Sequence, residues 1–261
     1  MRLHKNGVPI VCVDDWRRIA PPKAEYQWVE GRSAYELAHA WCGRGAPAVP
    51  PELTALFESR AETRGLLIDE VLPEHRVSFD AHGGEPRNTD LALVGHTSES
   101  KVAVTIEAKA DEQFGATVGQ TVADALERAI ENPRSRGVRR LEDLVRALLP
   151  PRSKGRPHVC DLRYQLLTAV AGTLAYAAME GASLAVLIVH EFITDKTSDK
   201  RHGENAIDYD RFLHRFAGNP ISNDVRHSLL GPFFVPETSP FRGVPLLIGK
   251  TVSNCRISNL S

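Results

Sequence analysis

The chain lacks the long apolar segments of membrane proteins and secretory leaders. No apolar run approaches the roughly eighteen residues that a membrane-spanning helix needs. The stretch after Lys5 is only briefly apolar before Asp14 and Asp15 interrupt it, so it does not match a signal peptide either. We therefore expect a cytoplasmic protein that makes no contact with a membrane.

Cysteine is scarce and widely spaced. The four cysteines stand at positions 12, 42, 160 and 255, and no two of them form a CxxC pair. Zinc knuckles and disulfide frameworks both need more regular spacings than these. We expect the four thiols to be reduced and structural.

An excess of charge of either sign is missing as well. The 32 Lys and Arg residues nearly balance the 33 Asp and Glu residues, which leaves a net charge of −1. Proteins that bind nucleic acid usually carry a basic footprint, so such a footprint would have to be local here. With 42% hydrophobic and 25% charged residues, the 261-residue chain has a globular composition and can bury a core.

Several common catalytic motifs are incomplete. Gly249-Lys250-Thr251 is similar to the end of a phosphate-binding loop, but the preceding glycine, Gly243, is one position too far away. His190 and Glu191 lack the second histidine of a zincin helix, and Ser183 lacks the flanking glycines of a nucleophile elbow. A nucleotide-binding loop and these two hydrolase motifs are therefore excluded.

The chain does contain two short apolar segments joined by a polar turn. Residues 90–95 lead into the turn at residues 96–100, and residues 101–109 return. Symmetric antiparallel pairing sets Asp90 opposite Glu107, and such partners share a face with Cβ atoms ~5 Å apart. Lys109 lies on the Glu107 side because side chains alternate along a strand.

The same register sorts the remaining side chains of this hairpin. The larger apolar pairs fall on one face and the smaller pairs fall on the face of the acids (Leu91 with Ile106 and Leu93 with Val104; Ala92 with Thr105 and Val94 with Ala103). A shift by one residue would place Asp90 and the leucines on the wrong faces. The hairpin therefore predicts one core face and one face with polar groups at its end.

Two neighbouring carboxylates and a lysine suit metal-dependent hydrolysis. Hard cations such as Mg²⁺ or Mn²⁺ take oxygen ligands and keep waters for chemistry. A bound cation activates water and neutralises phosphate charge, and an ammonium group such as that of Lys109 stabilises the transition state. The alternative is a solvated Glu–Lys charge pair of little energetic value, with Asp90 merely starting a strand.

Asp90, sixteen intervening residues and then Glu107-Ala108-Lys109 resemble the motif of the PD-(D/E)XK nuclease-like superfamily. Thr89 stands in place of the motif's proline. The resemblance covers about residues 51 to 192 and implies a Mg²⁺-dependent nuclease with catalytic Asp90, Glu107 and Lys109.

The resemblance also implies two further contributors to the site. Recombination-type members carry a glutamine at the start of the helix after the catalytic strand, which matches Gln165; the alternative is an ordinary exposed residue. Members often supply another acid from the first core helix, for which Glu58 or Glu62 could serve as a metal ligand. The alternative, favoured because helix faces are usually lined with glutamates, is that both lie on the solvated face of that helix.

Hydrophobic periodicity and capping residues predict the order of the core elements. Helices are expected over residues 51–62 and 162–180, the second capped by Asp161 and ended by Gly181. Strands are expected at residues 66–68, 76–79 and 183–190. This order predicts an α/β fold, a three-layer α/β/α sandwich around a mixed sheet. The resemblance implies a restriction-endonuclease-like core over residues 51–261, and a helical extension is expected over residues 1–50.

A basic segment lies between the Glu107 strand and the Gln165 helix. Residues 128–156 hold nine basic and three acidic residues, and residues 138–149 have helical spacing. We expect a basic insertion that contacts a phosphate backbone through Arg136, Arg139, Arg140, Arg152, Lys154 and Arg156. The alternative is a solvated charged face.

Two functions remain from the sequence. The first is a divalent-metal-dependent nuclease, with DNA favoured as substrate, in defence or repair and with a homodimer as an allowed assembly. The second is a catalytically silent module of the same fold that binds nucleic acid or a protein partner.

Overall fold

The protein is described here by a computed structural model that places residues 1–217 and 228–256. One eight-stranded mixed sheet runs through it in the order β2-β1-β3-β4-β5-β6-β8-β7. The strands are β1 (Arg2–Lys5), β2 (Val8–Pro9), β3 (Leu67–Val77), β4 (Arg87–His96), β5 (Lys101–Lys109), β6 (Leu184–Ile193), β7 (Leu229–Phe233) and β8 (Leu246–Asn254). Strands β5, β6 and β8 are mutually parallel, whereas β3, β4 and β5 pair in antiparallel fashion.

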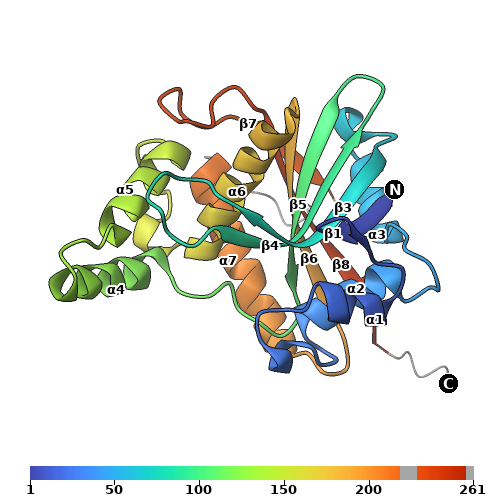
Figure 1. The fold of residues 1–261 in the computed structure, drawn as a ribbon. Coiled ribbons are helices and arrows are strands. Elements are labelled where there is room, and N and C mark those ends of the chain that lie inside the picture. Colours follow the sequence, from blue (N-terminus) through green and yellow to red (C-terminus); the bar gives the residue numbers. More distant parts are fainter. Residues whose placement is uncertain (218–227, 257–261) are drawn as a thin grey trace.

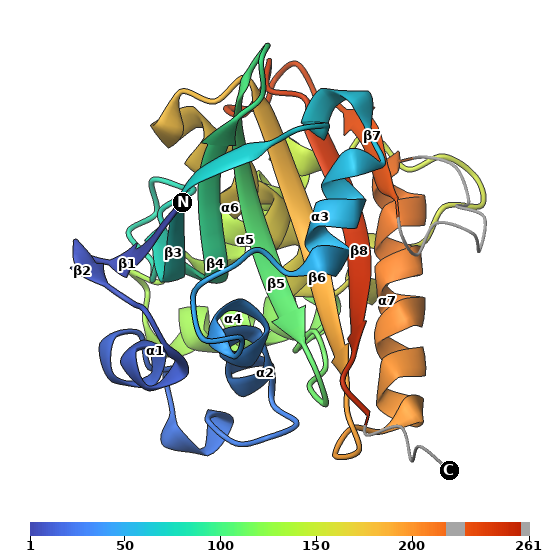
Figure 2. The ribbon, with the colours of Figure 1, turned by 90° about the vertical axis from the view of Figure 1, so that its right-hand side faces the viewer.

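Helices cover both faces of this sheet (Figures 1 and 2). One face carries α1 (Val13–Ile19), α2 (Ser33–Cys42) and α3 (Pro51–Glu58). The other carries α6 (Tyr164–Glu180) and α7 (Asp199–Ala217), and α5 (Gly137–Leu148) packs on α6, with α4 (Val118–Glu131) beside it. Each face has its own buried apolar cluster, as expected where parallel strands are covered on both sides. The α/β class is confirmed.

The register predicted for the β4–β5 hairpin is confirmed. Leu91 pairs with Ile106, Leu93 with Val104, and the smaller residues pair between them. The leucine face belongs to the cluster under α2 and α3, while Ala92 and Ala103 belong to the cluster under α6. The hairpin therefore delivers Glu107 toward the α6 side of the sheet, where Gln165 donates to it.

Helix α6 lies close to the sheet because its residues are small. Its interior positions are buried almost throughout, and Thr173 exchanges a hydrogen bond of 2.5 Å with Thr105 of β5. Gly181 ends the helix in the left-handed region at φ 61°, as predicted. Asp161, in contrast, does not cap it: Asp161 lies in a preceding 3-10 turn, and Arg163 occupies the N-cap without a side-chain bond.

One further expectation needs correction. The separate strands expected at residues 66–68 and 76–79 are one long strand, β3, which passes through Pro73 and then Glu74 at φ 51°. Helix α4 was not predicted; Thr117 starts it with a capping box to Gln120. The helix expected over residues 138–149 is confirmed as α5, shifted by one residue.

The first fifty residues are joined to the sheet and to its α3 side. Strand β1 pairs in parallel with β3, and the indoles of Trp16 and Trp41 are buried in the cluster on that face. All four cysteines are free. Among the described residues, no helix combines the length and apolarity that crossing a bilayer requires.

Candidate active site

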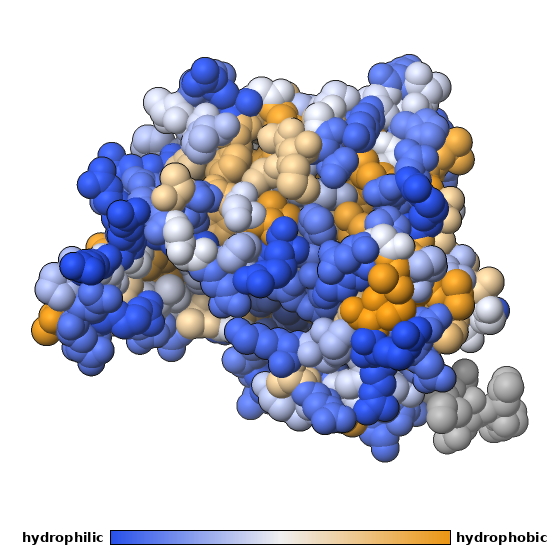
Figure 3. All heavy atoms as spheres, viewed as in Figure 1, coloured by the Kyte–Doolittle hydropathy of each residue, from blue (hydrophilic) through white to orange (hydrophobic). Residues whose placement is uncertain are grey.

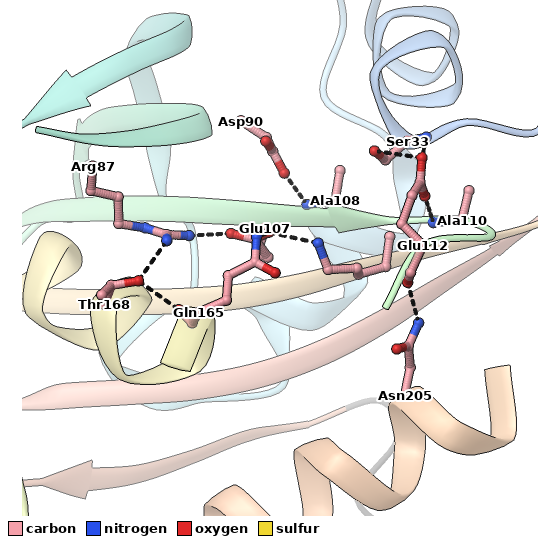
Figure 4. Close-up of polar contacts among 11 residues, drawn as sticks. Ser33, Arg87, Asp90, Glu107, Ala108, Ala110, Glu112, Gln165, Thr168 and Asn205 are labelled. Carbon is pink, nitrogen blue, oxygen red and sulfur yellow. Dashed lines mark hydrogen bonds and ion pairs between the residues drawn. The ribbon is translucent and has the colours of Figure 1, made fainter. Parts of the chain in front are cut away.

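A cavity of about 400 Å³ opens where β5 ends, between the start of α6 and the start of α2. Asp90 of β4, Glu107 and Lys109 of β5, and Gln165 of α6 all line it. Figure 4 shows Arg87 and Gln165 directed toward Glu107, while Asp90 is directed toward the backbone N–H of Ala108. In the space-filling view of Figure 3, this part of the surface is hollowed and hydrophilic. The structure thus brings together the four catalytic candidates that the sequence indicated.

Glu107 is the centre of the polar network. Its side chain is only 2% exposed, and its Oε1 accepts a hydrogen bond of 2.7 Å from Nζ of Lys109. Gln165 donates to the same oxygen, and the guanidinium of Arg87 donates to Oε2. Burial alone would raise the pKa of Glu107, but the charges of Lys109 and Arg87 outweigh it and hold the pKa below its usual value. Glu107 is therefore a carboxylate at neutral pH.

The pKa of Asp90 is shifted in the opposite direction to that of Glu107. The strand ladder ends at the Leu91–Ile106 pair, and Oδ2 of Asp90 accepts the next free backbone N–H, that of Ala108, at 2.7 Å. Burial, followed by the negative charge of Glu107, raises the pKa of Asp90 well above its ordinary value. Two carboxyl groups that repel in this way would gain from a shared cation.

Lys109 is buried and charged. Only 5% of the residue is exposed, and its Nζ lies 5.2 Å from the ring centroid of Phe114. Burial would lower the pKa of Lys109, but Glu107 and Asp90 outweigh it and raise that pKa above the ordinary value. Lys109 therefore stays protonated at neutral pH, and its ammonium group is held by Glu107 in the same cavity as Asp90.

Sequence reasoning missed Arg87. Its guanidinium joins Glu107 to Oγ1 of Thr168 on α6, the latter at 2.9 Å, and its stem lies against Gly172, where a Cβ atom would approach the arginine at 2.9 Å. Strict alternation puts Arg87 on the same face as Leu91. The left-handed residue Glu74 on β3, the neighbouring strand, marks where that alternation breaks. No local sequence signal reveals that break.

Glu112 was also missed. Its Oε1 accepts from the backbone N–H and the hydroxyl of Ser33 at the start of α2, at 3.1 and 3.4 Å, and its Oε2 accepts from the N–H of Ala110 at 3.1 Å. Its backbone carbonyl accepts from Asn205 of α7 at 2.8 Å. Glu112 therefore ties helices from both faces of the sheet to the rim of the cavity. Only tertiary structure could reveal it.

The structure does not bring Glu58 to this cavity, which corrects the expectation of an acid from the first core helix. Helix α3 packs on the opposite face through Leu53, Leu56 and Phe57. Glu58 accepts from the backbone N–H of Gly65 at 2.9 Å. The alternative, Glu62, pairs with Arg60 at 2.6 Å.

Helix α3 instead supplies Glu52 to a separate polar cluster with His190 and Ser253. Nε2 of His190 lies 3.2 Å from Oε1 of Glu52 and 2.8 Å from Oγ of Ser253. A catalytic serine triad uses the two ring nitrogens for different partners. Here both contacts fall on Nε2, while Nδ1 is buried and has no partner among the described residues. The cluster therefore does not form a hydrolytic relay.

The basic candidates divide between two places. Arg136 and Arg140, together with Arg128 and Arg134, line a cavity of about 360 Å³ at the start of α5, and Arg139 is exposed beside them. Arg140 is already paired with Asp80 at 2.6 Å. The remaining candidates lie on the loop that follows α5, with two exposed and one partly buried (Arg152, Lys154 and Arg156).

The carboxylates of the cavity are too few for an all-protein metal site but match the ligands that Mg²⁺ commonly takes from a protein. Within residues 1–217 and 228–256, no three His, Cys, Asp or Glu side chains are grouped as a metal-binding set. Mg²⁺ often uses only one or two carboxylates, and water and substrate phosphate complete its coordination. Asp90 and Glu107 fit that pattern, and their mutual repulsion favours a cation between them. A zinc-type site does not fit.

Comparison with known proteins adds one finding. A family model described as Domain of unknown function (DUF6946) matches residues 9–255. No curated protein and no solved structure matches the chain.

Proposed function

The chain belongs to the DUF6946 family, and we propose that it is a divalent-metal-dependent nuclease with a restriction-endonuclease-like core in a three-layer α/β/α sandwich. The observation that carries the proposal is the convergence of Asp90, Glu107 and Lys109 in one cavity at the end of a hairpin. The buried Glu107 and the partly buried Asp90 repel, and the buried ammonium group of Lys109 lies in the same cavity. This combination suits the charge of a phosphodiester transition state.

Each residue has a distinct task under this proposal. Asp90 and Glu107 would hold Mg²⁺ or Mn²⁺, which would lower the pKa of bound water and neutralise charge on phosphate. Lys109 would orient the attacking water and stabilise the developing negative charge. Gln165 positions Glu107 through its amide. Arg87 holds the other oxygen of Glu107 and keeps the carboxylate in place.

Nucleic acid is the proposed substrate, with DNA favoured. A phosphate group in the cavity would lie near two acids and a lysine, and the arginines at the start of α5 lie on the α6 side of the sheet, where Tyr164 and Gln165 form part of the cavity wall. Arginine forks match phosphate oxygens and would hold the backbone on either side of the reacting bond. A cytoplasmic role in defence or repair belongs to the same proposal.

A cleavage assay tests the proposal directly. Single- and double-stranded DNA and RNA are incubated with the protein and Mn²⁺ or Mg²⁺, and cleavage is expected for at least one substrate. Glu107→Ala should abolish it, whereas Glu58→Ala, which removes an acid outside the cavity, should not. Binding of nucleic acid without cleavage by the parent protein would favour the silent binding module instead.

A further inference from the structure

The cavity of about 360 Å³ at the start of α5 lies where α4 and α5 meet the loop between β3 and β4. In Figure 1 this loop reaches α5, where His82 of the loop contacts Asp143 at 2.9 Å. Four arginines line the cavity, and none of the described Asp or Glu residues does (Arg128, Arg134, Arg136, Arg140). The whole chain has a net charge of −1, so this wall is a local concentration of positive charge.

Arg140 is the fixed member of this wall. Its Nε donates to Oδ2 of Asp80 at 2.6 Å, its Nη2 donates to the carbonyl of Glu85 at 3.1 Å, and its guanidinium lies 4.9 Å from the ring centroid of Phe79. The backbone at Gly84 lies so close that a Cβ atom there would clash with Nη1. These contacts orient Arg140 before any ligand binds, which reduces the entropic cost of binding.

The other three arginines carry charge that no described acid balances. Arg128 lies in the last turn of α4, Arg134 in the turn that follows it, and Arg136 at the N-cap of α5. All three are exposed, and within the described part of the chain no ion pair or hydrogen bond engages their guanidinium groups. A concave surface lined by charge of one sign concentrates ions of the opposite sign, so an anion is the ligand that this cavity favours.

Further hydrogen-bond donors lie beside the guanidinium groups. Ser135 and Gly137, the first residue of α5, belong to the same wall. No side chain caps α5 at Arg136, and the first N–H groups of a helix have no acceptor within it. Oxygen atoms of an anion bound by the arginines can therefore also accept from the start of α5.

We propose that this cavity binds a phosphate monoester, namely the terminal phosphate of a nucleic-acid strand. A phosphate monoester carries a charge of about −1.5 to −2 at pH 7 and offers three strong acceptor oxygens, whereas an internal phosphodiester carries a single charge and two free oxygens. Four guanidinium forks have more donors than two oxygens can accept, so the monoester is the better match. The phosphate of a free nucleotide shares this chemistry, and the choice of a strand rests on the proposed nuclease function.

Binding is measured in EDTA, where metal-dependent cleavage does not interfere. Fluorescence anisotropy compares one internally labelled single-stranded DNA that carries a phosphate at its 5′ end, at its 3′ end or at neither end. One of the phosphorylated strands should bind about tenfold more tightly than the hydroxyl-ended strand, as expected for hydrogen bonds between charged groups. Calorimetry with AMP identifies the source of the phosphate: AMP that binds as tightly as the phosphorylated strand would identify a free nucleotide, and weaker binding would identify a strand end.

Arg136→Met should remove most of this roughly tenfold preference for the phosphorylated strand. The readout is the ratio of the two affinities, because the loss of any surface charge weakens binding to both strands. Arg146→Met is the matched control: it removes the same charge from an exposed position of α5 but does not line the cavity, so the ratio should not change. Arg128→Met, on α4, should lower the ratio as Arg136→Met does, without altering the N-cap of α5.

Equal affinity of the parent protein for phosphorylated and hydroxyl-ended strands, with no binding of AMP at millimolar concentration, would overturn the inference. So would a ratio that stays unchanged in both Arg136→Met and Arg128→Met. Neither result would bear on the proposed cleavage, because Asp90 and Glu107 line a different cavity. Conversely, a parent protein that prefers phosphorylated ends but cleaves no substrate would refute the nuclease proposal alone.

Discussion

Replacing Asp90 by asparagine is expected to stabilise the metal-free protein while it removes the proposed activity. The Asp90 carboxyl is partly buried near Glu107, and the asparagine carbonyl can still accept the Ala108 N–H bond. Two unit charges ~5 Å apart repel by about 3 kcal/mol at an effective dielectric constant of ~20. Lys109 offsets part of this repulsion, so a net gain of about 1–2 kcal/mol is expected.

Thermal and denaturant unfolding in EDTA measure this gain. For a chain of this size, 1 kcal/mol corresponds to roughly 2–4 °C in Tm, so the variant should melt roughly 2–8 °C above the parent. Under the proposal, saturating Mg²⁺ or Mn²⁺ should then raise the Tm of the parent but not of the variant, because only the folded parent would bind the cation. A lower Tm in EDTA, or equal metal-dependent shifts, would refute the reasoning.

The pH dependence of the stability difference between the parent and Asp90→Asn tests whether this difference is electrostatic. The folded pKa of Asp90 lies above its ordinary value of 3.8, so the folded state binds this proton more tightly than the unfolded chain does. The contribution of Asp90 to the free energy of unfolding therefore falls as pH rises from about 3.8 through the folded pKa. Parent and Asp90→Asn should differ least below pH 3.8, and the gap should be full above the folded pKa. A gap independent of pH would point to packing instead.

The remaining predictions concern the lysine and the arginines. Lys109→Ala should keep the metal-dependent Tm shift but slow cleavage by about 10²–10³-fold, and Lys109→Arg should rescue little because its planar fork replaces a compact ammonium; equal cleavage by Lys109→Ala under metal saturation would disprove its role. The double variant Arg136→Ala, Arg139→Ala should weaken nucleic-acid binding and reduce the salt slope by about one counterion per lost contact, and unchanged slopes would identify a solvated face. Arg87→Met should destabilise the metal-free protein, measured as a lower Tm, because it leaves Glu107 buried with less positive charge.

The sequence predicted the hairpin well because its side-chain pattern has only one consistent register. The small and large apolar residues separate onto opposite faces only when Asp90 is set toward Glu107, and a short polar turn makes the pairing local. Helix α6 was predicted for a similar reason: a long periodic segment ends at a glycine that adopts the left-handed conformation. Both features depend on neighbours in sequence.

The parts that could not be predicted depend on tertiary structure or on a break in periodicity. Arg87 reaches Glu107 on the α6 side although alternation sets it on the Leu91 face, and Glu74 at φ 51° on the next strand marks the irregularity. Glu58 failed as a candidate because a helical pattern does not say which face of the sheet the helix covers. In both cases the sequence predicts the type of element correctly but does not determine which face of the sheet the side chain reaches.

The first fifty residues illustrate how far placement changes the interpretation of a segment. From the sequence they were an extension of uncertain purpose, yet Gln27 and Ser33 line the same cavity as Asp90 and Glu107. Glu112 holds Ser33 there from the segment that follows β5. The family match, which spans residues 9–255, includes this segment together with the hairpin. A cavity wall built from residues as far apart as Ser33 and Gln165 requires α2 to be in place for the site to be complete, so disruption of α2 should affect the site as directly as a change in the hairpin.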